Sequence, residues 1–200
     1  VTKGEYTITA NATQVVGEID LNDNTYNFGA LYVGIRDIAI TNITPSKTIT
    51  NDTLVRINVT IENHGEFVET FNVTLYSNAK EIGTETVTNL GATKTTTLTF
   101  AWNTMLVEAG SYLISATATT VPGEIKTDDN TRIYGYIIET ILGDVTGEGK
   151  VDILDIATIA KAFGAEPGHP KWNSNADLDD NNKIDILDIA KAAKNYGKEI

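Results

Sequence analysis

The stretch Asp177-Leu-Asp-Asp-Asn-Asn-Lys-Ile-Asp-Ile-Leu-Asp188 decides how the C-terminal part of this chain folds. It carries oxygen-bearing side chains at positions 1, 3, 5, 9 and 12, has a backbone carbonyl available at position 7, and runs into an Ile- and Ala-rich segment. Calcium-binding loops of the EF-hand type offer their ligands at this spacing. The stretch therefore predicts an EF-hand-like calcium loop followed directly by a helix.

A second copy of this pattern begins 33 residues earlier, as Asp144-Val-Thr-Gly-Glu-Gly-Lys-Val-Asp-Ile-Leu-Asp155. Two aligned copies arise by chance far less often than one, so the sequence predicts a duplicated loop–helix unit with two calcium ions. Gly149 and Asn182 stand at position 6, where the loop must turn sharply. Val151 and Ile184, at position 8, are expected to couple the two loops through a short strand-like contact. The predicted ligands are Asp144, Thr146, Glu148, the Lys150 carbonyl, Asp152 and Asp155 in the first loop, and Asp177, Asp179, Asn181, the Lys183 carbonyl, Asp185 and Asp188 in the second.

The chain before these loops shows the pattern of a β-sandwich. Residues 54–62 alternate cleanly, with Val55, Ile57, Val59 and Ile61 on one face of a predicted strand. Thr, Val and Ile dominate and no helical period is present, so we expect an immunoglobulin-like sandwich of about seven strands. The strand-like segments are residues 35–43, 54–62, 67–76, 80–87, 95–102, 111–120 and 130–138.

An internal repeat extends the pattern toward the N-terminus. Residues 4–29 match residues 110–135 at a constant offset of 106. A period of this size is typical of whole domains in tandem. We therefore expect three parts: residues 1–30 as the C-terminal hairpin of a preceding, incomplete sandwich repeat, residues 31–140 as a complete sandwich, and residues 141–200 as the calcium module. Both hairpins contain acidic turns, which turn chemistry explains on its own; an interdomain calcium there is the second interpretation.

Composition excludes several functions. The chain has 27 acidic and 15 basic residues, a net charge of −12, which argues against nucleic acid as a partner. The sequence contains no cysteine, which excludes disulfides and thiolate zinc sites. No apolar run approaches the roughly 20 residues of a membrane-spanning helix. Only His64 and His169 could serve as imidazole bases and no Gly-rich phosphate loop is present, so we expect no enzyme.

Five Asn-X-Ser/Thr patterns could accept N-glycans, and chance is an alternative explanation in a chain this rich in Asn and Thr. They lie at Asn11, Asn42, Asn51, Asn58 and Asn72.

Residues 143–198 closely resemble a dockerin domain, through GDVTGEGKVD and ADLDDNNKID, each followed by a predicted helix. The resemblance implies two calcium ions and docking to a cohesin module. Thr146 and Glu148 depart from the usual Asn/Asp ligands. Positions 10 and 11, small hydroxyl residues in the best-known dockerins, are apolar here. These apolar pairs either complete the core of the module or form a docking face. The residues of this predicted face are Ile153, Leu154, Ala160, Lys161, Ile186, Leu187, Ala193 and Lys194.

The sandwich resembles the CARDB family of cell-adhesion-related domains, which occur as tandem repeats in archaeal and bacterial surface proteins. The resemblance rests on VRINVTIENHGEFVETFNVTLY at residues 55–76 and on GEIKTDDNTR at residues 123–132. It implies adhesion or spacing rather than catalysis.

Together these patterns predict a non-enzymatic, extracellular protein for calcium-dependent attachment, with a cohesin-like module or a neighbouring subunit as its partner. Two alternatives remain open. One is a structural subunit of an extracellular filament or sheath, a homo-oligomer assembled by strand complementation through the hairpin of residues 5–28. The other is carbohydrate binding by the sandwich.

Overall fold

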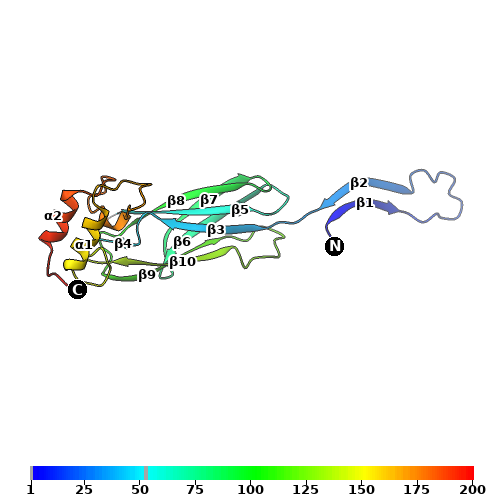
Figure 1. Ribbon diagram of the computed structural model, residues 1–200. Helices are drawn as coiled ribbons and strands as arrows, with labels where there is room; N and C mark the ends of the chain where they lie inside the picture. The colour runs from blue at the N-terminus through cyan, green and yellow to red at the C-terminus, as the bar shows by residue number, and fades with distance from the viewer. Residues whose placement is uncertain (1, 52–53) are drawn as a thin grey trace.

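The structure is a computed structural model that describes residues 2–51 and 54–200. A β-hairpin, a β-sandwich and a small helical module follow one another along an elongated molecule (Figure 1). The strands are β1 (Gly4–Asn11), β2 (Thr25–Val33), β3 (Ile38–Pro45), β4 (Ile49–Thr50), β5 (Leu54–Asn63), β6 (Glu69–Ser77), β7 (Lys80–Leu90), β8 (Thr95–Asn103), β9 (Gly110–Ala118) and β10 (Thr131–Glu139). The helices are α1 (Ile153–Ala162), the 3-10 helix η1 (Ser174–Ala176) and α2 (Ile186–Lys194).

The sandwich consists of two facing sheets, which confirms the predicted immunoglobulin-like fold. One has the strand order β4-β10-β9-β6-β7 and the other β3-β5-β8. The alternation in β5 places Val55, Ile57, Val59 and Ile61 in the core, each fully buried. All seven predicted strands are present. The short β4, which the sequence did not suggest, runs parallel to the end of β10.

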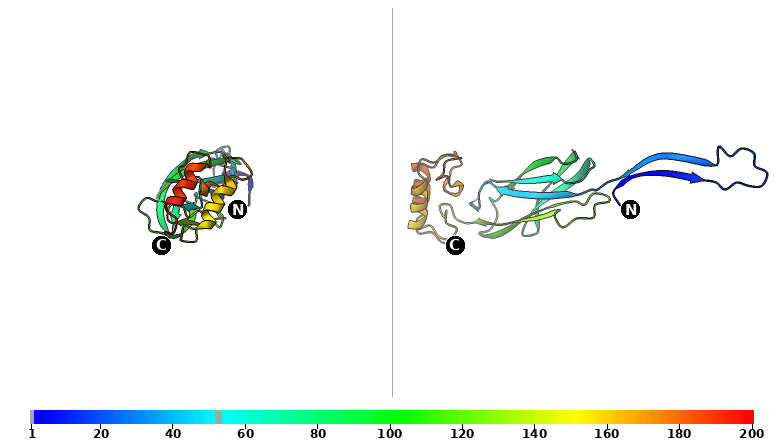
Figure 2. Two further views of the ribbon diagram at one scale, coloured as in Figure 1. Left: turned by 60° about the vertical axis from the view of Figure 1, so that its left-hand side comes forward. Right: turned by 45° about the vertical axis from the view of Figure 1, so that its right-hand side comes forward.

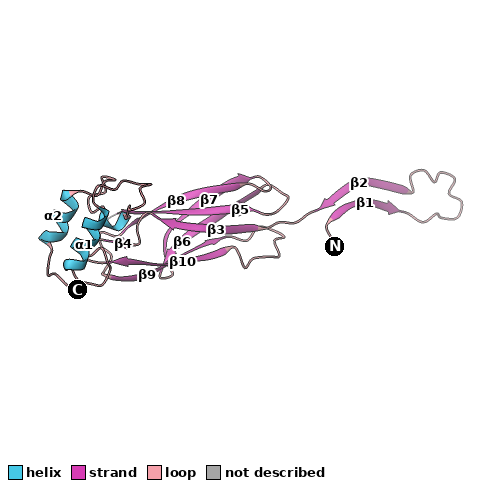
Figure 3. Cartoon of the chain, viewed as in Figure 1, coloured by secondary structure: helices cyan, strands magenta, loops and turns pink. Residues whose placement is uncertain are grey.

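The first hairpin, β1 and β2, forms a two-stranded sheet of its own and points away from the sandwich (Figure 3). Large apolar side chains on it are exposed, among them Tyr26, Phe28 and Leu31. Isolated two-stranded hairpins are marginally stable in water, because they bury little apolar surface. This hairpin therefore has an apolar face available for burial against another domain.

A small set of contacts joins the hairpin to the sandwich. Lys3 forms an ion pair with Glu66, and Glu66 Oε2 also accepts a hydrogen bond from the Ile35 amide at 3.0 Å. The Tyr32 and Phe67 rings lie 6.1 Å apart. These contacts all lie at the end of the sandwich where β2 leads into β3.

The helical module occupies the opposite end of the sandwich, where α1 and α2 lie side by side (Figure 2). Its core is separate from that of the sandwich and includes Val145, Ile159, Ile184 and Ala192, with Trp172 partly buried against it. The helices of the described residues have at most ten residues, and none is long and apolar enough to cross a membrane.

Polar contacts fix the module against the sandwich. Lys47 Nζ donates to the Asp177 carbonyl at 2.6 Å and forms an ion pair with Asp180 at 2.6 Å. Asn175 Oδ1 accepts from the amides of Thr48 and Ile49, each at 3.2 Å. Residues 47–49 of the sandwich therefore hold the helical module through Asn175, Asp177 and Asp180.

Candidate metal centres

The first acidic loop is organised around two buried carboxylates. Asp144 is 1% exposed and Asp155 is fully buried. Asp144 accepts hydrogen bonds from the amides of Gly147 at 2.7 Å and Gly149 at 2.8 Å. Asp155 Oδ1 accepts from the amides of Val145 and Thr146, each at 3.0 Å. The predicted ligands at positions 1 and 12 thus shape the loop through its backbone.

Three carboxylates of this loop come together. Ligand oxygens of Glu148, Asp152 and Asp155 all lie within 4.8 Å of one another. Lys150 Nζ lies 2.9 Å from Asp152 and 3.8 Å from Glu148, and its hydrogen bond to Asp152 lowers the pKa of that carboxyl. The Thr146 hydroxyl donates to Asp155 Oδ1 at 2.9 Å. A cation bound in this loop would take over from the exposed Lys150 ammonium in neutralising Glu148 and Asp152.

The second loop also brings three carboxylates together. Oxygens of Asp177, Asp179 and Asp188 lie within 4.8 Å of one another, so positions 1, 3 and 12 converge. Burial raises the pKa of Asp177, and the amides of Asn181 and Asn182 donate to its carboxylate at 3.2 and 2.9 Å. In the first loop the carboxylates that come together are those of positions 5, 9 and 12.

One oxygen of the second loop has no hydrogen-bond partner among the described residues. Asp179 Oδ1 is buried and unpaired, while Asp179 Oδ2 lies 3.9 Å from Lys191 Nζ. A buried acceptor without a partner is costly, and a bound cation removes that cost. Both loops offer oxygen donors, the ligands that calcium prefers. The residues present therefore fit calcium.

The two carboxylates at positions 9 and 12 also begin each helix. Asp152 and Asp185 are the N-caps, each accepting from the amide two residues later at 2.7 and 2.8 Å. Asp155 and Asp188 complete the capping boxes from the third helical position. The predicted calcium ligands at positions 9 and 12 therefore also cap the helices.

The predicted turn residues adopt the expected backbone. Gly149 has φ +88° and Asn182 has φ +64°, both in the left-handed region. Asn is among the few non-glycine residues that tolerate this region, because its short side chain bonds locally.

The prediction that Val151 and Ile184 pair with each other is wrong. Both residues are fully buried, but their backbones pair elsewhere. Val151 pairs with Gly197 and Lys198, after α2, and Ile184 pairs with Gly164 and Ala165, after α1. Each loop is therefore tied to the end of the other repeat's helix, which interlocks the two repeats.

The apolar pairs at positions 10 and 11 face solvent. Ile153 and Leu154 are 62% and 55% exposed, and Ile186 and Leu187 are 63% and 54% exposed. They therefore do not complete the core of the module. The flanking residues Ala160, Lys161, Ala193 and Lys194 are exposed too. The sequence did not single out Phe163 and Tyr196, which expose 54% and 57% one position before the glycine that ends each repeat.

The predicted glycan acceptors lie on accessible strands and turns. Asn11, Asn42, Asn58 and Asn72 are exposed, and Asn51 is half-buried. Asp52 and Thr53, which complete the Asn51 pattern, lie outside the described residues. Glycosylation stays a prediction.

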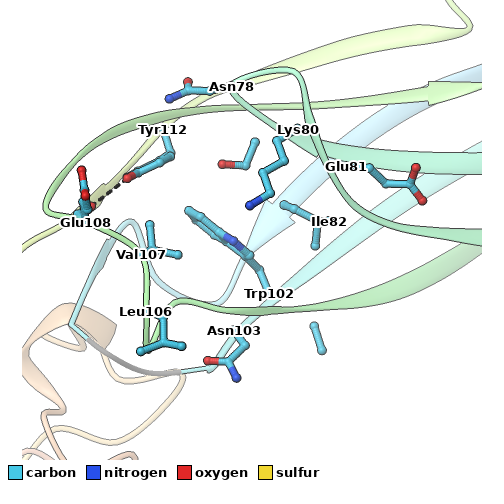
Figure 4. A pocket seen from close by; sticks show the side chains of 12 residues that line it. Asn78, Lys80, Glu81, Ile82, Trp102, Asn103, Leu106, Val107, Glu108 and Tyr112 are labelled. Carbon is cyan, nitrogen blue, oxygen red and sulfur yellow. Dashed lines mark hydrogen bonds between the residues drawn. The ribbon is translucent and has the colours of Figure 1, made fainter.

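A hollow of about 680 Å³ opens between the sheets beside Trp102 and Tyr112 (Figure 4). The Trp102 indole is only 8% exposed and meets the Tyr112 ring edge-on at 5.5 Å. The Tyr112 hydroxyl donates to the Glu108 carbonyl at 2.7 Å. Sugar rings stack on open aromatic faces, so this packing gives no support to the carbohydrate-binding alternative.

Comparison with known families agrees with this geometry. The family model for CARDB matches residues 35–130, and that for the Dockerin type I domain matches residues 142–195. Dockerin type I domains bind calcium and protein partners of the cohesin class. Dockerin and CARDB are non-catalytic domain families found in extracellular or surface proteins.

Solved structures resemble the chain more distantly. A CARDB domain of the PF1109 protein from Pyrococcus furiosus, in complex with di-metal ions, is 22% identical with a TM-score of 0.47, covering 56% of this chain and 99% of that one. A putative cell surface protein from Methanosarcina acetivorans is 25% identical with a TM-score of 0.43, covering 52% and 92%. A β-glucosidase from Listeria innocua is 12% identical with a TM-score of 0.39, covering 64% and 19%. No curated protein sequence matches the chain.

Proposed function

Because the chain carries a CARDB domain followed by a dockerin type I domain, we propose that it is a non-enzymatic extracellular attachment protein that docks, with calcium bound, to a cohesin-like module. In this proposal the helical module binds the partner, and the sandwich is the spacer that holds the module away from the rest of the protein. The domain division is residues 1–30, 31–140 and 141–200, with β2 continuing to Val33.

One observation carries the proposal: two equivalent apolar pairs are exposed on adjacent helices. Ile153-Leu154 begins α1 and Ile186-Leu187 begins α2, and all four side chains are more than half exposed. Exposed apolar side chains clustered on a small module are typical of protein-binding surfaces. Ala160, Lys161, Ala193 and Lys194 supply small and basic neighbours on the same helices.

Calcium makes this surface by ordering the helices that carry it. Asp152 and Asp155 cap α1, and Asp185 and Asp188 cap α2, so ions held by these carboxylates fix both helix starts. Binding free energy for a metal becomes folding free energy when the ligands converge only in the folded state. We expect two ions per chain.

A pull-down of the full chain with a panel of purified cohesin modules tests the proposal. Capture in millimolar calcium that disappears on chelation, and that reappears on adding calcium back, supports it. Failure of every cohesin-bearing protein of the source organism to bind the calcium-loaded chain would refute it. A calcium-independent interaction would point to the sandwich instead.

A second candidate function rests on the first hairpin, whose loop has the same hydrogen bonds as the β9–β10 loop. The Val15 amide donates to Glu18 at 3.0 Å, and its counterpart, the Val121 amide, donates to Glu124 at 2.9 Å. The backbone bonds Ala12 to Asn24 and Ala118 to Asn130 both measure 2.8 Å. This likeness supports the interpretation of residues 1–30 as the last hairpin of a preceding repeat.

In the complete sandwich the equivalent strand β9 also pairs with β6. A β6-like strand from a neighbouring domain or chain would complete β1 in the same way, by strand addition. If copies of the chain assemble in this way into a filament or sheath, deletion of residues 1–29 abolishes the assembly. Unchanged assembly after the deletion would rule out this candidate.

A further inference from the structure

Three metal-ligating side chains meet at the end of the sandwich next to the first hairpin. Asp37 precedes β3, His64 follows β5 and Asp129 precedes β10. One ligand atom from each lies within 4.8 Å of the other two. The start of β3, the end of β5 and the start of β10 lie at the end of the sandwich opposite the helical module (Figure 1).

Backbone hydrogen bonds hold the three segments together before any ligand is considered. The Asp37 carbonyl accepts from the amides of His64 at 2.9 Å and Gly65 at 3.2 Å. The Asp129 carbonyl accepts from the Ile40 amide at 2.9 Å. The side chains therefore project from a fixed framework, which is the condition for a preorganised site.

Two carboxylate oxygens in this cluster are buried without a partner. Asp37 Oδ1 and Asp129 Oδ1 have no hydrogen-bond donor among the described residues. The neighbouring Asn130 is 3% exposed, and its Oδ1 is also buried without a donor. Buried acceptors are normally satisfied, so the two unpaired carboxylate oxygens of Asp37 and Asp129 point to a missing positive group.

The His64 ring is oriented as a metal-ligating imidazole usually is. Its Nε2 lies 2.9 Å from Glu62 Oε2, and a carboxylate accepts only, so Nε2 carries the proton. In the neutral ring the lone pair is then on Nδ1, which lies 3.9 Å from Asp37 Oδ2. A cation bound here would bridge these two acceptors. A histidine that binds a metal through one nitrogen typically donates the other N–H to a carboxylate.

Lys126 supplies the cluster with one positive charge. Its ammonium contacts Asp129 Oδ2 and lies 3.9 Å from Asp37 Oδ2. The Lys126 side chain is 54% exposed, so it can turn into solvent. One ammonium faces two carboxylates and leaves their other oxygens unpaired, so a divalent ion would satisfy the cluster more fully.

We propose that Asp37, His64 and Asp129 form a metal site for a divalent transition ion such as Zn²⁺. An imidazole nitrogen with two carboxylates suits zinc, whereas calcium takes oxygen ligands. Water completes the coordination, because His64 is exposed on its outer side. The site binds independently of the two calcium loops and of docking.

The ion would link the segments that connect the hairpin to the sandwich. Asp37 lies four residues after the end of β2, so a metal bond to it restrains the connection between hairpin and sandwich. The Glu66 contact with Lys3 lies on the same turn as His64. Zinc would therefore stiffen the joint between consecutive repeats.

Calorimetric titration of the full chain with Zn²⁺, in calcium sufficient to saturate the loops, tests the site. We expect one zinc ion per chain. His64→Ala and Asp129→Asn each weaken binding at least about tenfold, and Glu62→Gln weakens it by about 10-fold through the ring orientation. His169→Ala, which removes the other imidazole, leaves zinc affinity unchanged.

Lys126→Met separates a metal site from a simple ion-pair cluster, because its predicted effect is a gain that misfolding cannot produce. Removing the competing ammonium should tighten zinc binding several-fold. Unchanged or weaker zinc binding in Lys126→Met, or zinc binding that survives His64→Ala at full affinity, overturns the proposal. The temperature of sandwich unfolding should rise with zinc in the parent chain and stay constant in His64→Ala.

Discussion

Thr140, the residue that follows β10, donates a hydrogen bond from its hydroxyl to Asp144 Oδ2 across 2.7 Å. Thr140 is 7% exposed and Asp144 is 1% exposed, so this bond is shielded from water. Because Asp144 is position 1 of the first loop, the sandwich directly positions a proposed calcium ligand of the helical module.

Thr140→Val should therefore weaken calcium binding at the first loop and leave the second loop unchanged. A hydrogen bond to a charged group contributes about 1.5–3 kcal/mol, which predicts a loss of affinity on the order of tenfold or more. Calcium titration followed by amide signals of each loop measures this. Thr131→Val is the matched control, since the Thr131 hydroxyl bonds only across an exposed pair at 3.0 Å. Equal weakening in both variants would contradict the assignment.

Lys47→Met should loosen the helical module from the sandwich. The Lys47 side chain is 13% exposed and contacts both the Asp177 carbonyl and Asp180. Partly buried ion pairs of this kind stabilise by about 1 kcal/mol, so each domain should stay folded while their mutual orientation broadens. Residual dipolar couplings or small-angle scattering measure the orientation. The exposed Lys94 gives the control variant Lys94→Met; an unchanged orientation in Lys47→Met would refute the role.

Sequence periodicity was sufficient for the parts of the fold that repeat locally. The alternation of apolar and polar residues in β5 predicts a strand with one buried face, and the spacing of polar residues from Asp177 predicts a loop followed by a helix. Strands, helix starts and turn residues such as Asn182 could therefore be predicted from the sequence. The pairing of Val151 with Gly197 did not, because it depends on how the two repeats interlock in space.

Contacts between segments far apart in the sequence could not be predicted either. His64 and Asp129 are 65 positions apart and meet only because β5 ends and β10 begins at the same end of the sandwich. The exposure of Ile153 and Leu154 likewise depends on the tertiary packing of the helical module. Their position in the sequence is compatible with core and surface alike. They are exposed in the structure because smaller residues such as Ala162 and Ala192 fill the core of the helical module.

Acid should release the hairpin from the sandwich. The hydrogen bond from Lys3, then that from the Ile35 amide, lowers the pKa of Glu66 below its ordinary value. A lowered folded-state pKa means that the contact stabilises the joint fully above the ordinary glutamate pKa of about 4.3 and is lost as the pH falls through the depressed value. Hydrogen exchange at the Ile35 amide should therefore accelerate beyond its intrinsic pH trend below about pH 4. Glu66→Gln should show no such acid-dependent step, and an identical pH profile in both proteins would dismiss Glu66 as the cause.

Removal of calcium should unfold the helical module and spare the sandwich. Asp144, Asp155, Asp177 and Asp188 are buried, and each loop brings three carboxylates within 4.8 Å of one another, so without ions their repulsion opposes folding. With a chelator, far-ultraviolet circular dichroism should lose its helical signal and amides of α1 and α2 should exchange rapidly. Amides of β5 should stay protected, because the sandwich core is separate. Protection of α1 and α2 that persists without calcium would show that the ions are not needed for folding.

Replacing the exposed apolar pairs should abolish docking without unfolding the module. A chain with Ile153→Ser, Leu154→Ser, Ile186→Ser and Leu187→Ser loses the proposed contact surface, yet exposed substitutions usually change stability by within about 0.5 kcal/mol each. Cohesin binding should fall below detection while calcium binding and helical signal persist. Ile159→Ala is the matched control: Ile159 is fully buried, so this variant should lose about 2–5 kcal/mol of stability while its remaining folded fraction binds normally. If the four serine substitutions unfold the module as Ile159→Ala does, these side chains are structural and the docking face lies elsewhere.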